Sequence, residues 1–136
     1  MSTSAPRGER GERAGRGLAV AAEALYLANL LIAPGLAYAL LVLLYLRHRR
    51  EAPPLARGHL RQATLAGFWA GILLIVATTL IATLGGPSQP ATWVAVILYF
   101  TTVHAALVLA GALGLARALS GQPFRYPLIG PRDHGD

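Results

Sequence analysis

The side chains of this chain that could do chemistry are few, and they lie within long apolar runs. Among the polar and ionisable groups that interrupt apolar sequence, we single out Glu23, Asn29, Thr78, Thr101 and His104. A polar group in hydrocarbon is costly unless it has a partner, so residues of this kind mark either packing hydrogen bonds or contacts with a ligand or transported species. We take these five as a candidate intramembrane polar site.

His104 admits three hypotheses. It is a neutral packing residue bonded to a threonine or to Asn29, a residue that handles protons or contacts a ligand, or a haem or metal ligand paired with His104 of a second chain. The other histidines are at the ends of runs or in tails: His48, His59 and His134. None is expected at the depth of His104, so we predict no metal and no cofactor within one chain.

Signatures of soluble enzymes are absent from the sequence. It contains no GxSxG, Walker loop, HExxH or GxGxxG, and no paired carboxylates in one segment. With no cysteine there is neither a thiolate nucleophile nor a disulfide. Glu23, the one acid in an apolar run, is expected to reach the headgroup region. We therefore predict that the protein is not an enzyme.

The elements that position these residues are predicted to be membrane helices. Of 136 residues, 54% are hydrophobic and 13% charged, a composition typical of a protein whose solvent is the bilayer. Apolar stretches cover residues 17–46, 63–84 and 91–119, and each exceeds the roughly 20 residues that cross a bilayer. The predicted fold is all-α, a polytopic protein with three transmembrane helices.

Proline and glycine divide these elements. Pro34-Gly35 predicts a kink in the first span, and LAYA at residues 36–39 leaves a cleaved signal peptide as the alternative for this segment. The uncharged GGPSQP at residues 85–90 predicts a tight turn, so helices 2 and 3 should form an antiparallel hairpin. Outside the helical domain, 17–128, we expect a disordered basic tail over 1–16 and a short tail over 129–136.

Charge predicts the orientation. All twelve basic residues are arginine, and the net charge is +6. Three spans would place eight arginines with the first connection and the C-terminus and four with the N-terminal tail. The positive-inside rule then predicts a multi-pass protein of the bacterial cytoplasmic (inner) membrane, with the N-terminus outside and the C-terminus inside. Since the charge lies outside the apolar runs, we expect lipid rather than nucleic acid as the partner.

Small residues spaced by four predict close helix packing in the second and third spans. The candidate packing positions are Gly67, Gly71, Ala110 and Gly114. Such stripes seal either an internal hairpin or a homo-oligomer.

Basic and aromatic residues at the span ends predict contacts with the membrane interface. Before the second span these are Arg57, His59, Arg61 and Gln62, and after the third they are Phe124, Arg125 and Tyr126. Snorkelling arginines and amphipathic rings would anchor these ends at the headgroups, with docking of anionic lipid or a partner segment as the alternative. Gly121 is expected to cap the third helix.

HLRQA at residues 59–63 and FRYPL at residues 124–128 together carry a family likeness. With the basic first connection, the chain resembles the small bacterial membrane proteins of unknown function grouped with Tic-twenty, a chloroplast import subunit. The resemblance implies helical packing in a translocon-like membrane assembly and no established activity. Leu65 and Gly67 stand where that family often has Asn and Gln.

The predicted function follows from packing stripes without catalytic machinery. We expect an accessory or assembly subunit that acts through helix contacts, in a homo-oligomer or a larger membrane complex. The alternative is a component of a transporter or channel whose path is lined by His104, Thr101, Thr78 and Asn29. It would have to be oligomeric, because three spans are too few to enclose a pathway in one chain.

Overall fold

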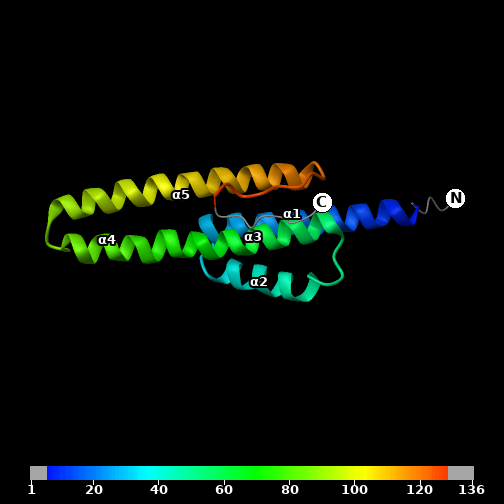
Figure 1. The fold of residues 1–136 in the computed structure, drawn as a ribbon, viewed down its shortest axis with the longest axis horizontal. Helices are drawn as coiled ribbons and strands as arrows, with labels where there is room; N and C mark the ends of the chain where they lie inside the picture. Colours follow the sequence, from blue (N-terminus) through cyan, green and yellow to red (C-terminus); the bar gives the residue numbers. More distant parts are fainter. Residues whose placement is uncertain (1–5, 129–136) are drawn as a thin grey trace.

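The computed structural model describes residues 6–128, which are helical and contain no strand. In chain order the elements are α1 (Arg7–Leu31), α2 (Leu36–His48), α3 (Pro54–Gly71), the π-helix η1 (Ile72–Val76), α4 (Ala77–Gly85) and α5 (Pro90–Leu119). The helices α3, η1 and α4 follow one another without a break and form one rod (Figure 1). The all-α prediction is confirmed.

Two rods are long and apolar enough to cross a membrane. They are residues Pro54–Gly85 and Pro90–Leu119, of 32 and 30 residues with mean hydropathy 2.2 and 2.0. A rise of about 1.5 Å per residue makes each about 45 Å long. The rods run antiparallel and join at a turn in which Gly86 has φ 89° (Figure 1). The second and third predicted spans therefore correspond to these rods.

The first apolar stretch does not form a continuous span, which corrects the prediction of three. After α1 ends, the chain reverses through Pro34 and Gly35, and α2 runs back beside α1 (Figure 1). Pro34 offers no N–H to prolong α1, and Gly35 takes φ 85°, which glycine adopts without strain. The resulting α1–α2 hairpin ends near the middle of the two rods.

The N-terminal segment is helical from Arg7, where a disordered tail was expected over residues 1–16. Residues 1–5 and the predicted tail 129–136 lie outside the described range. Arginine and glutamate are good helix formers, and Glu9 in the first turn complements the helix dipole. A Cβ built on Gly15 would lie 3.2 Å from the ring of Pro53, so this helix also packs on the chain that follows α2.

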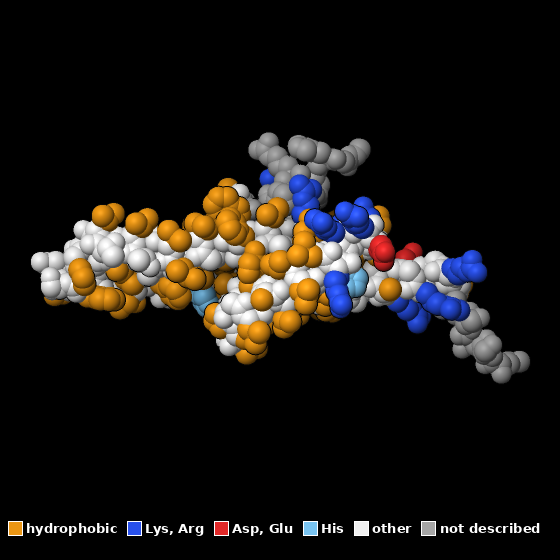
Figure 2. All heavy atoms as spheres, turned by 90° about the horizontal axis from the view of Figure 1, so that it is seen from below, with side chains coloured by type: hydrophobic (Ala, Val, Ile, Leu, Met, Phe, Trp, Pro, Cys, Tyr) orange, Lys and Arg blue, Asp and Glu red, His pale blue; other side chains and the backbone are white. Residues whose placement is uncertain are grey.

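The described arginines gather at one end of the molecule (Figure 2). Gly15 lies against Pro53, and a Cβ on Gly121 would be 3.2 Å from the Arg16 guanidinium. The N-terminal helix, the first connection and the segment after α5 therefore share one end. The three-span prediction placed the N-terminal segment opposite the C-terminal one, whereas in the structure the α1–α2 hairpin begins and ends at the same end of the molecule.

The candidate packing residues contact side chains of α1 and α2. A Cβ on Gly67 would lie 2.7 Å from the Tyr38 ring, and one on Gly114 would lie 2.7 Å from the Glu23 carboxylate. Ala110 packs against the main core cluster. Gly71 differs, because a Cβ there would meet nothing within 4 Å. Thus α1 separates the rods near the arginine-rich end, and part of the glycine stripe on the Pro54–Gly85 rod is left open.

Candidate functional site

A buried acid and a buried histidine form the centre of the structure near the arginine-rich end. Glu23 on α1 and His59 on α3 are 0% and 1% exposed, and Glu23 Oε1 lies 2.7 Å from His59 Nδ1. From the sequence, Glu23 was expected to reach the headgroup region and His59 to contact lipid or a partner, whereas the structure buries both side chains within the chain. Burying either group alone would be costly, so each is retained by the other.

The hydrogen bonds of His59 define how protons are shared. Its Nε2 lies 2.7 Å from the carbonyl oxygen of Gln122, which accepts only, so Nε2 donates. Toward Glu23, either an imidazolium donates to a carboxylate or a protonated carboxyl donates to neutral imidazole. Both arrangements place one proton between the two side chains and leave the pair without net charge.

Tyr126 completes this buried network from the other end of the sequence. Its hydroxyl donates to Glu23 Oε2, and its backbone N–H donates to Gln62 Oε1 at 3.1 Å. Burial and the neighbouring Glu23 raise the pKa of Tyr126, so the phenol stays protonated and acts as the donor. Its ring lies 4.9 Å from that of Tyr26. We call Glu23, His59, Gln62 and Tyr126 the buried clamp.

Residues 120–128, the C-terminal strap, bring Tyr126 to the clamp. Gly121 (φ 69°) ends α5 as predicted, with Gln122 N–H donating to Arg117 O at 2.8 Å in a Schellman motif. In the extended chain that follows, Phe124 and Tyr126 turn inward with rings 5.0 Å apart, while Arg125 is exposed. Tyr126 and Gln62 are fully buried, so their predicted interface roles are wrong. Arg57 and Arg61 are exposed at the start of α3.

His104 has a second, separate role at the end of the α1–α2 hairpin. Its Nε2 lies 3.0 Å from the carbonyl oxygen of Leu30, one of the last carbonyls of α1, which have no partner within the helix. The ring also stacks on Phe100 at 5.7 Å. His104 therefore holds the hairpin tip against α5.

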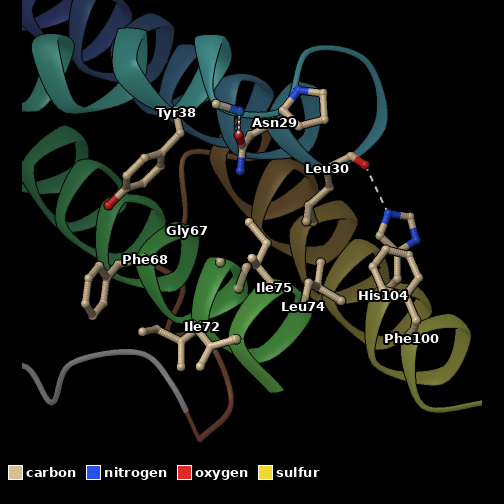
Figure 3. Close-up of a pocket in the computed structure, with 15 residues that line it drawn as sticks. Asn29, Leu30, Tyr38, Gly67, Phe68, Ile72, Leu74, Ile75, Phe100 and His104 are labelled. Carbon is tan, nitrogen blue, oxygen red and sulfur yellow. Dashed lines mark hydrogen bonds between the residues drawn. The ribbon is translucent and has the colours of Figure 1, made fainter. Parts of the chain in front are cut away.

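An apolar groove opens beside that tip (Figure 3). Its volume is about 450 Å³, and it lies between the hairpin tip, the second half of α3 with η1, and α5. We call it the tip groove. Its lining includes Asn29, Tyr38, Gly71, Ile75, Phe100 and His104.

Comparison with protein families gives a match over nearly the whole described chain. The model of the MamF_MmsF family, described as a magnetosome magnetite crystal formation protein family, matches residues 14–132. The chain belongs to this family. Comparisons with curated proteins and with solved structures gave no match. The prediction of a small bacterial membrane protein family is thereby confirmed at that level, and the matched range contains the buried clamp and the tip groove.

In this MamF_MmsF member the five predicted polar residues do not form one site. Glu23 belongs to the buried clamp, and His104 bonds to the hairpin tip. Asn29 Oδ1 accepts the Gly35 N–H at 2.8 Å within the turn. Thr101 is exposed, and the buried Thr78 hydroxyl has no partner among the described residues. Asn29 and His104 both line the tip groove, whereas the other three residues do not, so no continuous polar path joins the five.

The pairing of the buried polar groups in this family member was not predicted from its sequence. Glu23 and His59 are 36 residues apart, and Glu23 and Tyr126 are 103 apart. The available signal was an acid inside an apolar run, which demands a partner; the sequence did not say which residue supplies it. Within the described residues, no group of three or more His, Cys, Asp or Glu could hold a metal ion.

Proposed function

We propose that this protein is a non-enzymatic accessory subunit of a membrane in which magnetite crystals form, as its family description indicates. The observation that carries the proposal is the sealing of the buried clamp. Glu23, His59 and Tyr126 are at most 1% exposed, so a substrate in water or lipid has no access to the groups best suited to acid–base chemistry. Their arrangement suits a fastening of α1, α3 and the C-terminal strap.

The proposed topology has two full spans and one hairpin that enters the bilayer and returns. The described arginines gather at one end, whereas the turn at residues 86–89 carries no charge. By the positive-inside rule, the arginine-rich end faces the cytoplasm, with the start of α1 and the C-terminal strap on that side. The membrane is the cytoplasmic membrane or the magnetosome membrane that the family name indicates.

We propose that the protein acts through contacts made by its exposed helix faces. Beyond the hairpin tip only the two rods continue, and they expose large apolar side chains: Ile75, Leu80, Leu84, Ile97 and Leu98. Such a face suits lipid or another apolar helix, in a homo-oligomer or a larger complex. The transport alternative required polar residues along one path, and their separation leaves it without support. Kinship with Tic-twenty stays a prediction based on HLRQA and FRYPL.

Complementation tests the proposal. A magnetite-forming bacterium that lacks its own member of the family would receive this chain, and crystal dimensions would be measured by electron microscopy. We expect crystal size to move back toward that of the parent strain, with the chain in the membrane fraction. A Glu23→Ala variant, which leaves His59 and Tyr126 buried without their partner, serves as the control that disrupts the buried clamp. Unchanged crystals despite normal membrane insertion of the intact chain would refute the role in magnetite formation.

A further inference from the structure

The proposed topology of two full spans, on which this inference rests, places the tip groove at the depth of the bilayer centre. On α5, His104 is 13 residues from Arg117 and 14 from Pro90, the first residue of the helix. On the other rod Gly71 is 10 residues from Arg61. At about 1.5 Å per residue these separations are about 20, 21 and 15 Å, against a half-thickness of about 15 Å for the hydrocarbon core. A molecule in the groove is therefore surrounded by acyl chains.

Asn29 brings an unused hydrogen-bond donor to this depth. Its Oδ1 accepts the Gly35 N–H, which identifies the other amide atom as nitrogen. That nitrogen points toward the groove (Figure 3) and makes no hydrogen bond within the described part of the chain. An amide left unpaired in hydrocarbon costs several kcal/mol. The groove thus combines apolar walls with one donor that needs an acceptor.

The size of the groove suits a small molecule. Its volume of about 450 Å³ is within the range of small-molecule sites. Tyr38, Phe68 and Phe100 contribute aromatic faces, and Gly71 leaves part of the groove unfilled. The π-helix η1 also contributes to the lining, and such segments are frequent at functional sites.

The depth of the tip groove in the bilayer limits which carbonyl compounds can reach Asn29. Ester carbonyls of phospholipids lie near the headgroups, and the backbone carbonyls of a partner helix are already bonded within that helix. A lipid-soluble quinone carries ring carbonyls on an apolar body that dissolves in the hydrocarbon core. We propose that the tip groove binds the ring of a lipid-soluble quinone, with the Asn29 amide donating to a ring carbonyl.

The single asparagine of the sequence makes this testable. The full chain, labelled with ¹⁵N only at the asparagine side chain, would be placed in nanodiscs of synthetic phosphatidylcholine without quinone. Decylubiquinone is the probe, and decylbenzene is the control with the same tail and no carbonyl. We expect a saturable NMR shift of the one side-chain amide with decylubiquinone and none with decylbenzene.

Two variants connect the shift to the groove. Gly71→Leu fills the open space, and binding should weaken at least about tenfold. Gly58→Leu on the same helix is the matched control, because a Cβ there also meets nothing within 4 Å and Gly58 is outside the groove lining. It should bind like the parent chain. If Gly71→Leu misfolds, Ile75→Trp fills the groove from the neighbouring turn.

Three results would overturn the proposal: no shift with decylubiquinone, equal shifts with both probes, or full binding by a folded groove-filling variant. A shift that grows with protein concentration in the absence of probe would also overturn it, in favour of a second copy of the chain at Asn29. None of these results bears on crystal size in the complementation experiment, so the two proposals fail independently.

Discussion

The imidazole of His104 donates from Nε2 to the carbonyl oxygen of Leu30 over 3.0 Å, joining α5 to the end of α1. Leu30 is four residues before Pro34, which has no N–H to offer, and the chain reverses at Gly35. A side chain 74 residues away supplies the missing donor. The hairpin tip is therefore held by tertiary contact.

His104→Ala should loosen the hairpin tip, because it leaves a backbone carbonyl without a donor in hydrocarbon. We expect a loss of about 1–3 kcal/mol in stability and faster hydrogen exchange at residues 30–37. Thermal unfolding in detergent and exchange mass spectrometry measure the two effects. Thr101→Ala, at an exposed position on the same helix, is the control. Equal behaviour of both variants would show that the Leu30 bond contributes nothing.

Breaking the buried clamp on one side should cost more than replacing the pair. Glu23→Ala leaves His59 and Tyr126 buried without their acceptor, and the expected loss is about 3–5 kcal/mol. A Glu23→Leu, His59→Leu double variant removes both ionisable groups, so it should recover much of that loss. Thermal unfolding, followed by the loss of helix content on heating, measures the stability of each variant. If the loss of stability in a double variant equals the sum of the losses in the two single variants, Glu23 and His59 are not coupled.

Two glycines of the Pro54–Gly85 rod should respond differently to one added methyl group. Gly67→Ala places a Cβ 2.7 Å from the Tyr38 ring and should cost about 1–3 kcal/mol. Gly71→Ala meets nothing within 4 Å and gains helix propensity, so it should be neutral or stabilising by up to about 1 kcal/mol. Melting temperatures of the two variants test this difference. A loss for Gly71→Ala equal to that for Gly67→Ala would argue against the close contact of Gly67 with Tyr38.

Single cysteines can report the topology, because the sequence has none of its own. In intact cells, an impermeant maleimide should label Ser88→Cys at the uncharged turn. Gly11→Cys on α1 and Glu51→Cys after α2 should react only after the membrane is permeabilised. Labelling of Gly11→Cys from outside would restore the orientation expected for three spans and contradict the α1–α2 hairpin.

Alkali should weaken the fold through Tyr126. Its pKa is raised from the ordinary value of 10.0 by burial and by Glu23, so above about pH 10 the unfolded chain loses a proton that the folded chain keeps. The contribution is complete below pH 10 and is lost as pH rises further. Tyr126→Phe should show a shallower fall of unfolding temperature between pH 9 and 11. If the unfolding temperatures of the parent chain and of Tyr126→Phe fall equally with pH, the alkaline sensitivity does not come from Tyr126.

Local signals in the sequence were sufficient for much of the fold. Two apolar stretches, an uncharged turn between them and Gly121 after the last helix predicted the rods, their hairpin and the final cap, because chain length, hydropathy and glycine geometry act within a few residues. Pro34-Gly35 likewise predicted a break. What followed that break was not predicted, since a kink and a full reversal use the same two residues.

Which buried polar residues hydrogen-bond to one another was decided by the tertiary structure alone. Glu23, His59, Gln62 and Tyr126 each looked like a separate interfacial or intramembrane residue in the sequence, and the same was true of His104 and Leu30. A buried polar group requires a complement but does not specify where in the chain it lies. Only the return of α2 and the passage of the C-terminal strap across α1 and α3 bring these residues within hydrogen-bonding distance.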